Sequence, residues 1–162
     1  MGKRDTEYDD IIATAVVAAA GLGAGTAFAP GADIALCSGT WIAMMAAIAD
    51  RSGHDENKVY WSKVLTSVGM GAAGYWAGSK VFTGILFYLI PGAGSITAAT
   101  LNAVLNGLYT WRLGTSLVNL FNKPDFDIRD AESVARYLKG ALAPIPTYGE
   151  VRHVWELIRE HM

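Results

Sequence analysis

Charged residues are scarce in this sequence and unevenly spread along it. Asp, Glu, Lys and Arg together make up 17% of the 162 residues, whereas about a quarter is usual in a globular protein. Residues 11–49 contain a single charged residue, Asp33, and residues 64–111 contain only Lys80. A soluble domain of this size rarely has two such stretches. The pattern therefore favours segments that hide from water in a membrane or against one another.

The sequence also lacks features that several functional classes require. The formal net charge of −2 gives no basic footprint, so we expect no nucleic-acid partner. The single cysteine, Cys37, cannot form an internal disulfide and is expected to be a small buried residue. His54, His153 and His161 lack the spacing of metal ligands, and no serine stands in a nucleophile motif. We therefore expect no enzymatic activity, metal or cofactor.

A glycine-rich segment, residues 69–74, matches the dinucleotide-binding fingerprint letter by letter. That fingerprint also needs an acidic residue about 20 positions further on to bind the ribose hydroxyls. No Asp or Glu occurs between Glu56 and Asp125, so the nucleotide interpretation is rejected. We interpret Gly74 and Gly78, four residues apart, as small residues that let helices approach closely.

Proline and glycine residues divide the apolar segments and predict an all-α fold. We expect Pro30 to end a first helix and Asp33 to cap a second. Pro91, with Gly92 and Gly94, is expected to end a third helix and to permit a tight reversal. The sequence thus predicts four long helices, over residues 7–29, 34–51, 55–90 and 95–121. They would form two long Gly/Ala-rich helical hairpins that fold into a bundle.

The C-terminal part of the sequence is typical of an amphipathic tail. Asp127 is expected to cap a short helix over residues 131–139, and Gly140 to end it. Thr147 and Glu150 form a capping box for a last helix, whose apolar residues recur at helical spacing: Val151, Val154, Trp155 and Ile158. We expect this helix to pack on its own domain, with docking to a partner or to a membrane surface as the alternative.

These patterns divide the chain into two parts. Residues 1–122 are predicted to form a hydrophobic helical-hairpin domain, and residues 123–162 an amphipathic C-terminal appendage. The chain length suits one domain with a short addition.

A polar stripe runs along the fourth predicted helix. Asn102, Asn106 and Thr110 recur at helical spacing, beside the small residues Ala99, Ala103 and Gly107. An asparagine inside an apolar helix needs a hydrogen-bond partner. The stripe therefore predicts a close, hydrogen-bonded contact between helices. A water-lined pore is the more specific alternative.

Several of these elements together resemble one known family. The elements are Pro30-Gly31-Ala32-Asp33-Ile34, Leu89-Ile90-Pro91-Gly92-Ala93-Gly94, Leu101-Asn102-Ala103, and the run from Tyr109 to Gly114 followed by Phe121. In this combination they resemble the YcjF-type bacterial domain of unknown function, a hydrophobic helical domain. The resemblance covers residues 11–122.

The resemblance implies a membrane-associated partner of a GTPase and brings no catalytic residue with it. Members of the family occur alone, as membrane proteins, or attached to Era-like small GTPases. It thus implies a P-loop GTPase as partner and the bacterial inner membrane as location, with the cytoplasm as the alternative. The residues expected to shape the fold and its contacts are Pro30, Asp33, Gly74, Gly78, Pro91, Gly92, Gly94, Asn102, Asn106 and Gly114.

Three functional hypotheses follow. The first is a non-catalytic, membrane-associated module that scaffolds or regulates a partner. A homo-oligomer is compatible with this hypothesis. The second is a pore-forming or small transport component, motivated by the glycine-rich helices and the Asn102 and Asn106 stripe. The third is a soluble helical bundle that binds a lipid-like ligand, motivated by the modest hydropathy of the first helix.

Overall fold

The structure is a computed structural model that describes residues 7–25, 32–54, 57–90 and 97–161. These residues form eight helices and contain no strand, which confirms the predicted all-α bundle. The helices are α1 (Asp9–Gly25), α2 (Ala32–Arg51), α3 (Lys58–Val68), α4 (Gly71–Ala77), α5 (Lys80–Leu89), α6 (Ala98–Phe121), α7 (Ala131–Leu142) and α8 (Tyr148–His161).

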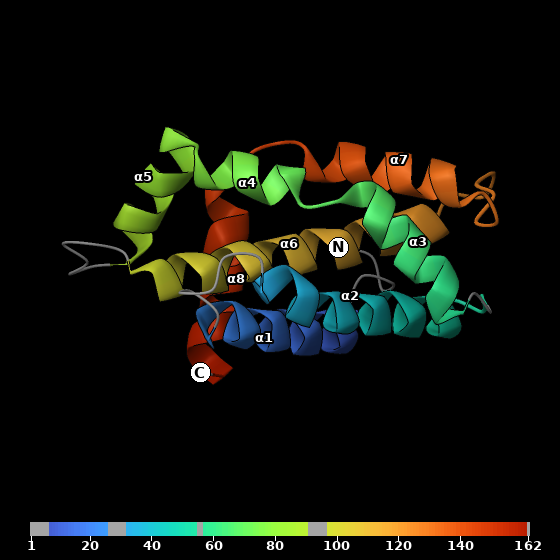
Figure 1. The fold of residues 1–162 in the computed structure, drawn as a ribbon, viewed down its shortest axis with the longest axis horizontal. Helices are drawn as coiled ribbons and strands as arrows, with labels where there is room; N and C mark the ends of the chain where they lie inside the picture. The colour runs from blue at the N-terminus through green and yellow to red at the C-terminus, as the bar shows by residue number, and fades with distance from the viewer. Residues whose placement is uncertain (1–6, 26–31, 55–56, 91–96, 162) are drawn as a thin grey trace.

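Helix α6 is the centre of the bundle. It crosses the middle of the molecule, with α1 and α2 on one side and α4, α5 and α7 on the other, while α3 runs past one end of it from one side to the other (Figure 1). It packs against α1, α2, α4, α7 and α8. Almost every residue of α6 from Ala103 to Leu120 is buried, as expected for a helix that is apolar nearly all round.

Aromatic side chains fill the core beside α6. Trp41 of α2 and Tyr109 of α6 lie 4.8 Å apart between ring centroids, and both are buried. The Tyr109 hydroxyl donates a 2.8 Å hydrogen bond to the carbonyl oxygen of Gly69, and burial raises the pKa of this phenol above its ordinary value. The bond fixes the turn between α3 and α4 to the central helix.

The prediction of one helix over residues 55–90 is wrong, because this segment forms three short helices. Gly69 ends α3 with a φ of 66°, a left-handed conformation that glycine adopts without steric cost. A second break follows α4, where Ser79 caps α5 by accepting a hydrogen bond from the backbone N–H of Phe82. No residue of this segment is a proline, so the breaks depend on glycine and on a cap that the apolar pattern concealed.

Helix ends elsewhere agree with the sequence in part. The helices α2 and α6 end at Arg51 and Phe121, as predicted. However, Asp130 caps α7 in place of Asp127, because its carboxylate accepts from the N–H groups of Glu132 and Ser133. Gly140 lies inside α7 and does not end it.

The C-terminal helices share the core of the helices before them. Helix α7 packs on α3 and α6, and α8 packs on α1, α5 and α6. The capping box is present, since the Thr147 N–H donates to Glu150 at 2.7 Å and the Glu150 N–H donates to the Thr147 hydroxyl at 3.4 Å. The tail thus packs on its own bundle, while the division into a domain over residues 1–122 and an appendage over residues 123–162 stays a prediction.

Candidate functional site

The polar stripe of α6 lies against α1 and α2. Asn106 is 2% exposed and donates to the carbonyl oxygen of Asn102 at 3.0 Å. A Cβ atom added at Gly23 of α1 would lie 2.4 Å from Asn106 Nδ2 and 2.8 Å from the Asn102 carbonyl oxygen. Glycine is therefore required for the close approach of the two helices. The water-lined interpretation of the stripe gains no support from these buried contacts.

The third residue of the stripe joins α6 to α2. Trp41 Nε1 donates to the Thr110 hydroxyl at 2.7 Å, and that hydroxyl donates to the Asn106 carbonyl oxygen at 2.6 Å. All three side chains are buried. The stripe is thus hydrogen-bonded to α2 and closely packed against α1.

This connection predicts a difference between two tryptophan variants. Trp41→Phe removes a buried hydrogen bond worth about 1 kcal/mol, whereas the buried Nε1 of Trp61 has no partner among the described residues. Both substitutions replace a buried indole by a phenyl ring and so remove a similar apolar volume. We therefore expect Trp41→Phe to lower the free energy of unfolding by about 1 kcal/mol more than Trp61→Phe. Urea unfolding monitored by circular dichroism measures both. Equal losses would contradict a role for the bond to Thr110.

Two further glycines of α6 lie where other helices cross it. A Cβ at Gly114 would lie 2.9 Å from Ile12 Cγ1 and 3.1 Å from Met44 Sδ, so α1 and α2 both pack here. A Cβ at Gly107 would lie 2.9 Å from Val154 Cγ1 of α8. The small residues of α6 therefore position three neighbouring helices.

Two of the predicted small-residue contacts are not found. At Gly74, nothing else in the described part of the chain lies within 4 Å of an added Cβ, and at Gly78 only carbonyls of the preceding turn do. Both residues are exposed. The physical reason is that α4 ends at Ala77, so no long helix is present to pack along this pair.

The predicted helix stops lie mainly outside the described residues. Pro30, Pro91, Gly92 and Gly94 belong to segments that the structure does not describe. Asp33 lies one residue inside α2, which begins at Ala32. The prediction that it caps this helix is therefore wrong, because the helix starts earlier than the apolar pattern suggested.

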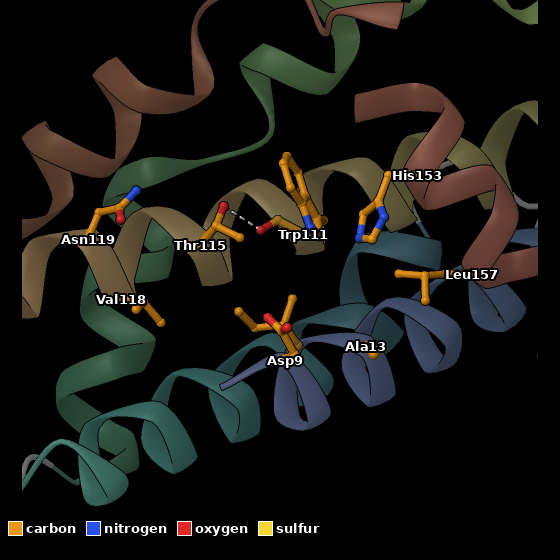
Figure 2. A pocket seen from close by; sticks show the side chains of 9 residues that line it. Asp9, Ala13, Trp111, Thr115, Val118, Asn119, His153 and Leu157 are labelled. Carbon is orange, nitrogen blue, oxygen red and sulfur yellow. Dashed lines mark hydrogen bonds between the residues drawn. The ribbon is translucent and has the colours of Figure 1, made fainter. Parts of the chain in front are cut away.

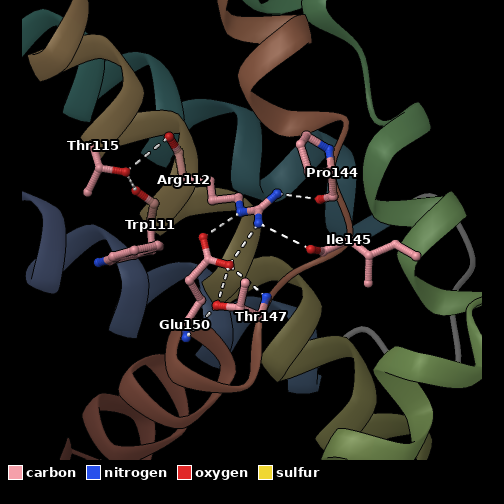
Figure 3. A network of polar contacts seen from close by, with 7 residues as sticks. All are labelled: Trp111, Arg112, Thr115, Pro144, Ile145, Thr147 and Glu150. Carbon is pink, nitrogen blue, oxygen red and sulfur yellow. Dashed lines mark hydrogen bonds and ion pairs between the residues drawn. The ribbon is translucent and has the colours of Figure 1, made fainter.

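Sequence reasoning missed a buried ion pair that joins α6 to the start of α8 (Figure 3). Arg112 Nε and Nη2 donate to the two carboxylate oxygens of Glu150 at 3.0 and 2.8 Å. The guanidinium also donates to the carbonyl oxygens of Pro144 and Ile145, and lies 5.2 Å from the ring centroid of Trp76. The Arg112 side chain is 8% exposed.

The ion pair sets the protonation of Glu150. Burial raises the pKa of this carboxyl, but the hydrogen bonds from Arg112 and Thr147 outweigh it, so the pKa lies below its ordinary value. Glu150 stays ionised in the folded protein near neutral pH. Its partner is 38 residues away in the sequence, and no local pattern indicates such a pairing.

A hollow of about 560 Å³ lies between α1, α6 and α8 (Figure 2). Asp9, Thr115, Asn119 and His153 supply polar groups, and the apolar part of its lining is Ile12, Ala13, Trp111, Val118 and Leu157. The rings of Trp111 and His153 lie 5.7 Å apart. An apolar hollow of this size with a few polar groups is typical of a small-molecule site.

Large apolar side chains are exposed on the short helices α4 and α5. They are Tyr75, Val81, Phe87 and Tyr88. Sequence analysis had no means of finding this surface, because a single long helix was expected there. Tyr148 of α8 lies beside it, with its ring centroid 5.9 Å from that of Tyr88.

Two properties of the described residues bear on function. No group of three or more His, Cys, Asp or Glu side chains there could hold a metal ion. One helical stretch there, Ile34–Arg51, is long and apolar enough to cross a membrane, and a third of it is buried in the bundle. Core helices of soluble proteins meet the same criterion, so this stretch alone does not decide the location.

The chain was compared with protein-family models, with curated proteins and with solved structures. None of the three comparisons found a match. The resemblance to the YcjF-type family thus stays a prediction from the sequence.

Proposed function

We propose that this protein is a non-catalytic helical module that associates with a membrane and holds a partner protein there. One observation carries the proposal: the bundle covers its charge-poor stretches only in part. Exposed large apolar side chains remain on α2, at Ile34 and Leu36, and on α4 and α5. Exposed apolar surface that is rimmed by polar groups marks a site of contact with lipid or with a partner.

The small residues of the outer helices support the same function. After its first turn, which contains Asp9 and Asp10, the exposed residues of α1 are Thr14, Ala18, Gly21 and Gly25, and none of these four is charged. Along α2 the exposed positions from Ile34 to Ala47 are uncharged as well. When a bilayer or another helix covers this face, no charged side chain has to lose its hydration.

The nature of the partner comes from the resemblance alone. A P-loop small GTPase is the partner that the resemblance favours, and the bacterial inner membrane the location. Co-purification of a GTPase in a nucleotide-dependent manner would support this part of the proposal.

Vesicle flotation tests the membrane association. The purified full-length protein is mixed with vesicles of bacterial polar lipids and centrifuged through a density gradient. We expect the protein to float with the vesicles. Protein that stays at the bottom of the gradient, and that is monodisperse without detergent, would contradict the proposal.

The hollow between α1, α6 and α8 favours a second candidate function. A soluble bundle could hold the apolar chain of a lipid-like ligand against Trp111 and Leu157, with its polar head near Asp9 or His153. In that case the detergent-free protein would stay in the supernatant and carry an acyl chain that native mass spectrometry detects. The flotation experiment therefore separates the two functions.

A further inference from the structure

Helix α5 is apolar on two opposite faces, and the bundle covers only one of them. Phe82 and Leu86 are buried against the rest of the molecule. Val81, Phe87 and Tyr88 point the other way and are 61%, 50% and 78% exposed. A helix that is apolar all round needs a second covering surface. In Figure 1, α5 stands at one end of the molecule, where such a surface can reach it.

The length of α5 limits what this surface can be. Its ten residues span about 15 Å, half the thickness of the hydrocarbon core of a bilayer. The helix is therefore too short to cross a membrane, and its neighbour α4 is shorter still. Tyrosine rings are enriched where lipid headgroups meet the hydrocarbon, and this surface carries both Tyr75 and Tyr88.

Charge distinguishes this part of the chain from the rest. Residues 57–124 contain five of the thirteen Lys and Arg residues and none of the fifteen Asp and Glu residues. Three of the five, Lys58, Lys63 and Lys80, are exposed on α3 and α5. The rest of the chain is acidic on balance. The α4–α5 end of the molecule, where Lys80 is exposed and neither helix contains an acidic residue, thus complements a negatively charged surface, although the net charge of the protein is −2.

A hollow next to Tyr75 extends this basic side. It has a volume of about 650 Å³, lies between the turn after α3 and helix α7, and has Lys139 in its wall. The hydroxyl-bearing residues Thr66 and Ser67 line the opposite part. A cation and hydroxyl groups beside exposed aromatic rings are the groups that anionic lipid headgroups bind.

We infer that the α4–α5 face, formed by Tyr75, Val81, Phe87 and Tyr88, docks in the headgroup region of a bilayer that contains anionic lipid. The apolar side chains enter the boundary between headgroups and acyl chains, and Lys80 stays at the level of the phosphates. The α1 and α2 face offers mostly alanine and glycine, which contribute little apolar area. This inference rests on the proposed function and adds to it the lipid class and the docking surface.

Two pairs of matched variants test the inference. Phe87→Ser on α5 is compared with Val59→Ser on α3, because both side chains are apolar and exposed, at 50% and 65%. Lys80→Gln on α5 is compared with Arg159→Gln on α8, both at exposed positions. Binding of each full-length protein is measured by flotation with vesicles of phosphatidylcholine alone and with vesicles that also contain phosphatidylglycerol. Thermal unfolding confirms that each variant folds.

The inference predicts a specific order of affinities. The parent protein binds the phosphatidylglycerol vesicles more tightly, and added salt weakens this preference. Phe87→Ser combined with Tyr88→Ser weakens binding by about tenfold or more. Lys80→Gln weakens it by about fivefold, the effect of one cation near an anionic surface. Val59→Ser and Arg159→Gln leave binding unchanged.

Other outcomes would overturn the inference in distinguishable ways. If the protein floats but the α5 variants bind as well as the parent, the docking surface is elsewhere and the proposed function stands. If neither vesicle binds the protein, the proposed function fails as well. A dimer that Phe87→Ser dissociates, without any effect on vesicle binding, would assign the α4–α5 face to a second copy of the chain.

Discussion

Gly23→Ala is expected to destabilise the protein by about 2–3 kcal/mol. The added Cβ would lie 2.8 Å from the backbone carbonyl oxygen of Asn102, and 2.4 Å from Asn106 Nδ2. A backbone atom inside a central helix cannot move aside as the end of a flexible side chain can. The clash is therefore relieved only if α1 shifts away from α6, and this shift loosens the largest helix–helix contact of the bundle. Denaturant unfolding of the purified variant measures the loss.

Gly21→Ala is the matched control for this prediction. Gly21 lies in the same helix, two residues earlier, and an added Cβ there has nothing among the described residues within 4 Å. Alanine favours helix over glycine by about 1 kcal/mol, so this variant is expected to be slightly more stable than the parent. The same substitution thus has opposite effects at two neighbouring positions. Equal changes at Gly21 and Gly23 would show that α1 and α6 do not approach as closely as described.

The contrast between these glycines shows what the sequence could predict about the contact between α1 and α6. The spacing of Asn102 and Asn106 on one helix, beside small residues, indicated a close helix contact, and the contact lies there. The partner could not be deduced, because Gly21, Gly23 and Gly25 alternate in α1 without any pattern to show which one faces α6. Only the relative rotation of the two helices, which depends on the whole core, selects Gly23.

The limits of sequence reasoning are clearest between residues 57 and 90. The apolar pattern of this segment is the same whether one helix or three are formed, so the pattern alone favoured one. The hydrogen bond from Tyr109 holds the left-handed Gly69 at the first break, and Ser79 caps the helix that follows the second. The hydrogen bond is a contact across 40 residues, which no local pattern encodes. The exposed α4–α5 face exists only because of these breaks, so it could not be predicted either.

The ion pair of Arg112 illustrates the same limit for charge. Glu150 was predicted as part of a capping box with Thr147, which the structure contains. Its second role, as the partner of a buried arginine, depends on the tertiary fold. Arg112 is the one cation of α6, and a buried cation without a partner would be costly. An isolated charge in a long apolar helix therefore implies a partner, but it does not show which residue the partner is.

Arg112→Met is expected to have a larger effect than Gly23→Ala, a loss of about 3–4 kcal/mol in the free energy of unfolding. Methionine fills much of the same volume, but it leaves the Glu150 carboxylate and the carbonyl oxygens of Pro144 and Ile145 without their donor. The Glu150 side chain is 21% exposed, so water replaces part of the lost interaction and keeps the loss below the upper end for buried pairs. Chemical denaturation at pH 7 measures it.

The double variant Arg112→Met with Glu150→Gln separates the ion pair from the packing of the arginine. Glutamine keeps the capping box with Thr147 and removes the unpaired charge, so the double variant should regain part of the stability that Arg112→Met loses. The pH dependence gives a second test. Because the folded pKa of Glu150 lies below its ordinary value of 4.5, the stabilisation is complete above that pH and is lost as the pH falls through the folded pKa. Both variants should therefore lose less stability than the parent on acidification. A double variant less stable than Arg112→Met, with an unchanged acid dependence, would show that Arg112 acts through packing against Trp76 and not through its charge.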